Sequence, residues 1–437
     1  GCDVVLVERE LVGGECSSWA CMPSKALLRP GELAAETRRV DGVADAPVDP
    51  PAALRRRDEI VHGWDDRAQL PWLEERGIAL VRGSGRLVGV RRVAVAGAGA
   101  GGADLLLEAR RAVVLATGSG AAIPPVEGLP EARPWTNREA TSARAAPGRL
   151  LVLGGGVVGV ELAQAWARLG SAVTVVERGA RLLAGEEPAA SAAVADGLRR
   201  SGVDVRCGVA AAAARRDDDG TAVLALADGA QLRADELLVA AGRVPRTAGL
   251  GLEALGLQPD RPIPVDDRLR VPGHDWLYAI GDVAGLAQLT HEGKRHGRIV
   301  ADVIAGGDAA LRDDGPPPRV VFTDPTVAAV GHTLASARDA GLPAVAVDGR
   351  IDATPGASFR GPGADAFARW VVDEDRRVLL GATFVAPDAA ELLHAATVAV
   401  VGAVPVDRLA DATPPFPTRA EAWLELAAWA DRTRRSR

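Results

Sequence analysis

Two cysteines near the start of the chain lie close enough in sequence to carry redox chemistry. Cys16 and Cys21 are separated by four residues, and Lys25 follows one helical turn later. A thiol serves hydride-linked redox work as a thiolate or as a disulfide, and thiols at the start of a helix gain from its dipole. The alternatives are half of a zinc site or two buried cysteines. Since Cys2, Cys207 and the six histidines give no matching ligand spacing, we predict a redox pair and no metal site.

A glycine motif follows an apolar run in the middle of the chain. Gly154, Gly156 and Gly159 form G-x-G-x-x-G between a predicted strand and a predicted helix, and Glu177 lies 23 residues beyond the first glycine. Such glycines let the backbone approach a pyrophosphate, and the acid can bond a ribose 2′-hydroxyl. The alternative is a tight turn without a ligand. Glu177 would repel a 2′-phosphate and so favours NADH over NADPH, although the adjacent Arg178 weakens that preference.

An internal repeat relates the start of the chain to this motif. Residues 1–8 read GCDVVLVE and residues 170–177 read GSAVTVVE, and both are β-rich runs that end in Glu. The second copy is preceded by a strand, the glycine turn and a helix at residues 149–169. The first copy begins the printed sequence. By symmetry we expect a strand, a glycine turn and a helix to precede residue 1 in the whole protein.

Composition narrows the class of protein. The chain has 437 residues, which suggests about three domains at roughly 150 residues each. The net charge of −7 is spread along the chain, which argues against a nucleic-acid partner. No signal peptide is visible in the printed sequence, and no apolar run approaches about 18 residues, so we expect no membrane span. Four cysteines are too few for a disulfide scaffold and favour a cytoplasmic location. Cys2 and Cys207 lie in apolar runs and are predicted to be inert core residues.

The order of predicted elements gives an α/β fold with two Rossmann-like nucleotide-binding domains and a C-terminal α+β domain. Residues 78–116 alternate in polarity and predict a small antiparallel sheet. Apolar helices are predicted over residues 389–401 and 419–430. The predicted domains are a first nucleotide-binding domain at 1–147, to which the chain returns at 265–315, a second nucleotide-binding domain at 148–264, and a C-terminal domain at 316–437.

The segment GGECSSWACMPSKALL, residues 13–28, resembles the redox loop of the class I pyridine nucleotide-disulfide oxidoreductases. This family includes dihydrolipoamide dehydrogenase, glutathione reductase and mercuric reductase. The resemblance covers essentially the whole chain, with its motifs in family order. The other matching segments are ATGS at 116–119, the glycine motif at 154, AGRVPRTAGLGLE at 241–253, YAIGDV at 278–283, VVFTDPTVAAVG at 320–331 and LLGATFVAPDAAELLHAA at 379–396.

The resemblance implies two cofactors, FAD and NAD(P)H. Glu8 would hold the adenosine ribose of FAD, and Asp282 its ribityl or pyrophosphate region. His291 would begin a helix that points at the flavin, or would be an ordinary residue at a helix start. The residues implied to bind a cofactor are Glu8, Gly14, Cys16, Lys25, Gly85, Thr117, Gly118, Ser119, Gly154, Gly156, Gly159, Glu177, Gly242, Asp282 and His291.

The resemblance also implies a reaction path. Lys25 and Glu161 match the family's ion pair beside the flavin, although a surface helix charge is the alternative for Glu161. Electrons would pass from NAD(P)H through FAD to a Cys16–Cys21 disulfide, with Cys21 against the flavin and Cys16 attacking the substrate. The family further implies a homodimer formed through residues 319–437. The residues implied to be catalytic are Cys16, Cys21, Lys25, Glu161 and Glu421.

The chain departs from the family near its C-terminus. Phe416, Pro417 and Thr418 stand where the disulfide reductases carry His-Pro-Thr, while Glu421 keeps the acid position. A missing general base typically costs about 10²–10⁴-fold in the step that it serves, so efficient turnover of lipoamide or glutathione disulfide is not expected. The C-terminal cysteine pair of mercuric reductase is also missing, since the last cysteine is Cys207.

Two functions of different classes follow. The first is an FAD-dependent NAD(P)H oxidoreductase that passes electrons through Cys16–Cys21 to an unidentified small-molecule acceptor, such as a quinone. The second is a non-catalytic nicotinamide-binding or redox-sensing paralogue. The most useful experiment is the visible spectrum of the purified full-length protein, followed by a screen of electron acceptors.

Overall fold

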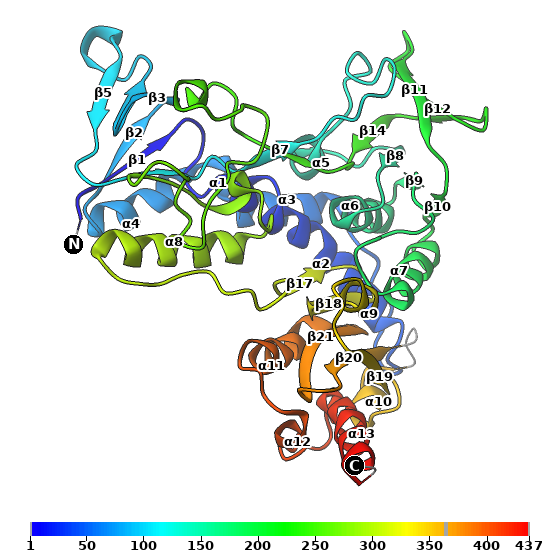
Figure 1. Ribbon diagram of the computed structural model, residues 1–437. Helices are drawn as coiled ribbons and strands as arrows, with labels where there is room; N and C mark the ends of the chain where they lie inside the picture. The colour runs from blue at the N-terminus through cyan, green and yellow to red at the C-terminus, as the bar shows by residue number, and fades with distance from the viewer. Residues whose placement is uncertain (1, 362–365, 436–437) are drawn as a thin grey trace. The chain divides into compact units, whose positions relative to one another are not determined.

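The computed structural model of this chain describes residues 2–361 and 366–435, which form two compact units (Figure 1). Each unit is assembled from three stretches of chain, so neither could have been cut out of the sequence as one continuous segment. The four-segment division predicted from the sequence stays a prediction. Unit 1 consists of residues 1–23, 56–122 and 242–313, and unit 2 of residues 24–55, 123–241 and 314–437.

Unit 1 contains two parallel strand pairs. β1 (Val4–Glu8) pairs with β2 (Ile78–Arg82), and β6 (Val113–Leu115) pairs with β16 (Leu277–Ala279). The single antiparallel sheet expected over residues 78–116 is therefore wrong for β2 and β6, because alternation fixes the face of a side chain but not the strand that pairs with it. The antiparallel strands of unit 1 are β3 (Gly85–Gly89), β4 (Arg92–Val95) and β5 (Leu105–Glu108) in one sheet, and β7 (Ser119–Ala121) with β15 (Arg243–Pro245).

One long helix and several short ones complete unit 1. α8 (Thr290–Ala305) buries Ile299, Val300 and Val303 against Tyr278 of β16. The turn η5 (Gly281–Ala284) follows the carboxyl end of β16, which is the end at which parallel sheets bind ligands. The shorter helices are α1 (Gly14–Ser18), η1 (His62–Trp64), η2 (Asp66–Gln69), α4 (Leu70–Glu75), η3 (Ala100–Gly102) and η4 (Leu252–Leu255).

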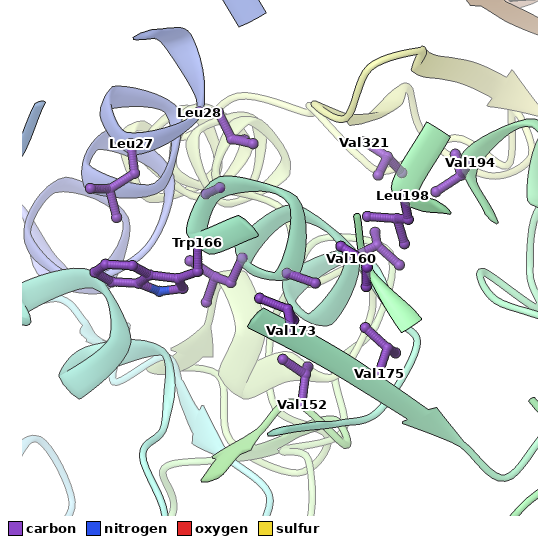
Figure 2. Close-up of a cluster of buried hydrophobic side chains, with 14 of the residues drawn as sticks. Leu27, Leu28, Val152, Val160, Trp166, Val173, Val175, Val194, Leu198 and Val321 are labelled. Carbon is purple, nitrogen blue, oxygen red and sulfur yellow. The ribbon is translucent and has the colours of Figure 1, made fainter. Parts of the chain in front are cut away.

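Unit 2 contains a four-stranded parallel sheet in the order β10–β9–β8–β14. Its core surrounds Trp166 of α6 (Val157–Arg168), which is fully buried. Figure 2 shows Leu27 and Leu28 of α2 (Cys21–Thr37) beside α6, with Val152 on the sheet side. The sheet strands are β8 (Arg149–Leu153), β9 (Ala172–Glu177), β10 (Asp204–Cys207) and β14 (Glu236–Val239), and the remaining elements are α3 (Pro50–Ile60, shared with unit 1), α5 (Asn137–Ser142), α7 (Pro188–Arg200), β11 (Ala211–Arg216), β12 (Ala222–Leu226) and β13 (Gln231–Ala234).

The last stretch of unit 2 forms a five-stranded antiparallel sheet with its own core around Trp370 and Phe384. The helix expected over 389–401 is confirmed as α11 (Ala389–Val401), and that expected over 419–430 begins as η6 (Arg419–Ala422) and continues as α13 (Trp423–Arg435). The sheet order is β17 (Arg319–Val321), β18 (Thr326–Gly331), β21 (Val378–Ala386), β20 (Phe367–Asp373) and β19 (Ala344–Arg350), and the short helices are α9 (Leu334–Asp339), α10 (Pro355–Ser358) and α12 (Val406–Leu409).

Two sequence-based expectations about burial have different outcomes. Cys2 was expected in the core but is exposed, because it precedes β1 rather than lying in it. Cys207, at the end of β10, packs against the core of unit 2. Its burial, with a further contribution from Glu177, raises the pKa of the Cys207 thiol, in keeping with an unreactive cysteine. In the described part of the chain, no helix has the length and apolar character that a membrane crossing requires.

Candidate functional site

The two cysteines predicted to form a redox pair are joined by a disulfide in unit 1. Cys16 lies in α1 and Cys21 is the first residue of α2, and their Cα atoms are 4.7 Å apart. The Sγ atom of Cys21 is 3.7 Å from the hydroxyl of Thr290, which begins α8. This disulfide can accept two electrons, and the dipole of α2 stabilises a thiolate at Cys21, its first residue.

Local contacts fix the loop that carries this disulfide. Gly13 and Gly14 both have positive φ, at 106° and 69°, a conformation that favours glycine just before a short helix. On the other side of the loop, the indole of Trp64 donates a hydrogen bond to the Ser18 carbonyl at 2.9 Å. The backbone around the cysteines is therefore held from both sides.

Glu15, beside Cys16, is a functional candidate that the sequence analysis missed. Its carboxylate pairs with Arg246 at 3.1 Å. The Arg246 carbonyl in turn accepts a hydrogen bond from the Thr117 hydroxyl at 2.7 Å. The pair ties α1 to the turn at residues 117–119, which the family resemblance assigns to the flavin. The only sequence signal for it was an acid between Gly14 and Cys16.

A polar cluster lies just beyond the carboxyl ends of β6 and β16. The Ser119 hydroxyl donates to the Asp282 carboxylate, and Arg243 donates to the Ser119 hydroxyl at 2.7 Å and to its carbonyl at 2.9 Å. The guanidinium of Arg243 is 3.8 Å from Asp282. A carboxylate for sugar hydroxyls and a guanidinium for phosphate oxygens, at this edge of parallel strands, fit the polar part of FAD. Arg243 was missed, although it lies in the segment AGRVPRTAGLGLE.

The other residues of unit 1 that the resemblance assigns to FAD differ in their contacts. Glu8 ends β1, and its carboxylate accepts a hydrogen bond from the Glu10 backbone at 2.8 Å. A side chain at Gly85 would lie 3.3 Å from Val7 and Val93, so its contacts in unit 1 are those of packing. Gly118 and Gly242 have positive φ, at 69° and 127°.

Two histidines on α8 differ in burial. His291, the sequence candidate, is exposed. His296, which the sequence analysis missed, is buried, and its Nδ1 accepts a hydrogen bond from the Gly281 backbone at 3.1 Å. Burial lowers the pKa of His296 below its ordinary value, so the neutral ring is favoured. His296 thus fixes the turn that carries Asp282.

The glycine turn of unit 2 fits a dinucleotide. A side chain at Gly159 would lie 2.0 Å from the Gly154 carbonyl, so the helix and turn meet closely. Gly156 has open space around its Cα, which a pyrophosphate would occupy. The Glu177 carboxylate accepts hydrogen bonds from the backbones of Gly155 and Gly179, each at 2.6 Å, which holds the acid beside the turn. Arg178 is exposed.

Lys25 and Glu161, which the family resemblance paired, form an ion pair of 2.6 Å in unit 2. The Glu161 side chain is only 3% exposed and that of Lys25 is 33% exposed, so Glu161 is no surface helix charge. The second carboxylate oxygen of Glu161 accepts a hydrogen bond from the Phe322 backbone at 2.9 Å. Both carboxylate oxygens of Glu161 therefore have hydrogen-bond partners, as a buried polar group requires.

The residues at the family's His-Pro-Thr position lie on the last stretch of unit 2. Phe416 is 75% exposed. Glu421 lies in η6, and its carboxylate accepts a hydrogen bond from the Thr418 backbone at 3.2 Å as part of a capping box. Among the described residues, no group of three or more His, Cys, Asp or Glu side chains could hold a metal ion.

Comparisons with known proteins agree with this arrangement. Residues 1–297 match the pyridine nucleotide-disulphide oxidoreductase family and residues 317–427 match its dimerisation domain. The chain is 34% identical to dihydrolipoyl dehydrogenase of Haloferax volcanii, covering 98% of this chain and 91% of the relative. It is 36% identical to mercuric reductase of Shigella flexneri, covering 98% of this chain and 76% of the relative.

Solved structures of flavoprotein disulfide reductases and related proteins are similar to this chain over nearly its whole length. LpdA from Mycobacterium tuberculosis superposes with a TM-score of 0.87 at 26% identity, covering 98% of this chain and 94% of the other. The Cu(II) complex of the HOCl-induced flavoprotein disulfide reductase RclA from Escherichia coli gives 0.85 at 25% identity, covering 98% and 93%.

The fold and the site therefore define a flavin-dependent oxidoreductase with a disulfide. The chain belongs to the pyridine nucleotide-disulphide oxidoreductase family, whose enzymes use FAD and NAD(P)H. The predicted fold class, with FAD and NAD domains and a C-terminal dimerisation domain, is confirmed.

Proposed function

We propose that the protein passes electrons from NAD(P)H through FAD to the Cys16–Cys21 disulfide and then to a small-molecule acceptor. The observation that carries this proposal is the disulfide between Cys16 and Cys21 at the start of α2. When bound, FAD supplies the exchange between two-electron hydride chemistry and thiol chemistry. The chain supplies the dithiol, the Lys25–Glu161 ion pair and the polar groups at Asp282 and Glu177.

The exposed Phe416 supports an acceptor that needs no histidine base. A phenyl ring cannot take up or give back the proton of a leaving thiol, whereas a quinone or a metal ion can accept electrons without it. The relatives are named for lipoamide and for mercury, and RclA has been solved with Cu(II). A useful acceptor panel therefore contains a quinone, lipoamide, glutathione disulfide, Hg(II) and Cu(II).

The test is NADH oxidation by the purified full-length protein with each acceptor in turn. We expect turnover with a quinone or Cu(II) and poor turnover with lipoamide and glutathione disulfide. Phe416→His, with Glu421 already present, should raise the disulfide activity by less than the 10²–10⁴-fold of an evolved base, since the pocket was not shaped for it. Lipoamide reduction by the wild type at ordinary enzyme rates would refute the interpretation of Phe416. A protein that binds FAD and NADH but reduces nothing would instead favour the redox-sensing paralogue.

We also propose a preference for NADH and a homodimer. The carboxylate of Glu177 supports NADH, because it can bond a 2′-hydroxyl and would repel a 2′-phosphate. Exposed apolar side chains on the dimerisation domain support the dimer, since a stable interface needs such a surface. These side chains are Val398 and Val401 of α11, Phe416, and Leu424 of α13. Light scattering at micromolar concentration tests the dimer.

A further inference from the structure

A buried row of polar side chains joins three segments of unit 2. α6 carries Glu161, Gln164 and Arg168 at spacings of three and four residues, which places them on one face of the helix. Glu161 and Gln164 are almost fully buried. We use the name polar seam for this row together with its partners, which are Lys25 of α2, Arg39 two residues after the end of α2, and the segment at residues 322–324. Its members form specific contacts rather than a loose charged surface, because each buried polar atom needs a partner.

Gln164 binds the backbone of Asp324 from both sides. Its side-chain carbonyl accepts from the Asp324 N–H at 2.7 Å, and its amide donates to the Asp324 carbonyl at 3.1 Å. In a β-sheet, the N–H and the carbonyl of a residue bind the backbone of the neighbouring strand. Here the side-chain amide of Gln164 takes the place of that neighbouring backbone. The segment that follows β17 is therefore fixed to α6 at one residue.

The Asp324 side chain adds a second anchor. Arg39 binds both carboxylate oxygens, at 3.1 and 2.8 Å, and Arg168 binds one at 2.8 Å. Burial alone would raise the pKa of Asp324, but the two guanidinium groups outweigh burial and lower the pKa below its ordinary value. Asp324 is thus held as an anion between Arg39, which follows α2, and Arg168 of α6.

Phe322, two residues earlier, contacts both members of the Lys25–Glu161 pair. Its backbone N–H donates to Glu161 Oε1 at 2.9 Å, while Lys25 Nζ binds Oε2 at 2.6 Å. The centre of its ring lies 4.8 Å from Lys25 Nζ, within the range of a cation–π contact. One residue therefore stabilises the anion through its backbone and the cation through its side chain.

The choice of lysine at position 25 matches this geometry. The chain contains 51 Lys and Arg residues together, and only Lys25 and Lys294 are lysines. A guanidinium fork would take both oxygens of Glu161 and compete with the Phe322 N–H, whereas an ammonium binds one oxygen and leaves the other free for it.

We propose that Phe322 is a positioning residue for the Lys25–Glu161 pair, and that the contacts of Gln164 and Asp324 hold Phe322 in place. Residue 322 belongs to the stretch that matches the dimerisation domain, so this domain contributes directly to the geometry of the ion pair. The catalytic consequence rests on the proposed function, whereas the contact of Phe322 with Lys25 and Glu161 is independent of it.

The first experiment measures the contact without any reaction. Reductive ¹³C-methylation labels only Lys25, Lys294 and the terminal amine, so the NMR spectrum has few signals. We expect the Lys25 methyl signal upfield of that of exposed Lys294, because it lies over an aromatic ring. Phe322→Leu should move it to the Lys294 position, and Phe322→Tyr should leave it upfield. Phe359→Leu, the same change at an exposed phenylalanine of unit 2, should move neither signal.

The second experiment measures the consequence in stopped flow, as the rate of flavin reduction by NADH. Phe322→Leu removes the ring but keeps the N–H, so we expect a fall of about two- to fivefold, with Phe322→Tyr close to wild type. The Kd for NADH should not change, because the nucleotide is proposed to bind at the glycine turn, whereas Phe322 contacts Lys25 and Glu161. Gln164→Met should lower the rate further, by about tenfold, because it frees the segment whose N–H binds Glu161.

The outcomes are distinguishable. Equal rates for wild type and Phe322→Leu, with the NMR signal displaced, would overturn the positioning role. A Lys25 signal that never moves would overturn the contact. If Gln164→Met does not fold, the comparison of Phe322→Leu with Phe322→Tyr still tests the positioning role of Phe322. If the protein binds no FAD, the proposed function fails, and the NMR comparison by itself supports or overturns the contact.

Discussion

The two nucleotide-binding sheets contain matching strands in different surroundings. In unit 2, β9 lies between β8 and β10, and Val173 and Val175 are buried. In unit 1, the matching strand β1 pairs with β2, and among the described strands none pairs with its other edge. There Val4 and Val5 are 46% and 47% exposed.

The comparison separates what a strand sequence specifies from what a sheet provides. VVLVE and AVTVVE both form strands that end in a carboxylate held by a backbone N–H, at Glu8 and at Glu177. Burial, however, comes from neighbours on both sides. The strand, glycine turn and helix that the internal repeat predicts for the first copy stay a prediction.

The largest expected effect concerns unit 1 alone. Cys21→Ser should abolish both the disulfide and the long-wavelength absorbance that a thiolate next to the flavin gives after two-electron reduction. Cys16→Ser should leave Cys21 as a free thiolate and make that absorbance permanent. Visible spectra during NADH titration check this. If both variants keep full quinone activity, the disulfide is not on that reaction path.

The two strand-end carboxylates should differ in the cofactor that they serve. Glu177→Ala removes a charge-assisted hydrogen bond, so kcat/KM for NADH should fall about 10–100-fold while that for NADPH changes less. Glu8→Ala should weaken FAD binding and leave the NADH to NADPH ratio unchanged. Steady-state kinetics with both nucleotides and FAD titration of the apoprotein measure the two effects. Equal kcat/KM for both nucleotides in the wild type would contradict the preference.

A matched pair of valines tests the difference in burial. Val175→Ala should lower the free energy of unfolding by about 1.5–3 kcal/mol, because the side chain is fully buried. Val5→Ala should cost less than about 0.5 kcal/mol in the chain as printed, because the side chain is half exposed. Denaturant unfolding of the variants measures both. Equal costs at the two positions would contradict the difference in burial.

The smallest expected effect is in the pH dependence of the two units. His296 in unit 1 and Asp324 in unit 2 both have a pKa below the ordinary value, which is 6.5 for His and 3.8 for Asp. In each case the unfolded chain takes up the proton first, so stability falls as the pH drops below the ordinary value. Two charged residues of α8 act on His296 in opposite directions: Glu292 raises its pKa and Arg295 lowers it.

The contribution of His296 to the stability of unit 1 should therefore be lost as the pH falls below about 6.5, and that of Asp324 to unit 2 as it falls below about 3.8. His296→Gln keeps an acceptor for the Gly281 N–H. This variant should remove the loss of stability near pH 6.5 and leave the loss near pH 3.8 unchanged. Hydrogen exchange followed by mass spectrometry, corrected for the intrinsic rate, separates residues 277–296 from residues 319–328. A single loss of protection in both peptides at one pH would contradict the assignment.

The sequence by itself determined the features that depend on neighbouring residues. The glycine turn at Gly154, the strands that end in Glu8 and Glu177, the cysteine pair and the helix at 389–401 each follow from types and spacings within a short window. Backbone geometry and side-chain periodicity act over that same range, so local patterns suffice.

Only the tertiary structure decided which distant residues meet. Phe322 reaches Lys25 and Glu161 because β17 leads the chain back to α6, and no local pattern encodes that return. Burial likewise separated Cys2 from Cys207, which had looked alike in sequence, and it drew attention to His296 rather than to the sequence candidate His291. A side chain's environment is set by the elements packed around it, and in this fold those come from stretches of chain far apart in sequence.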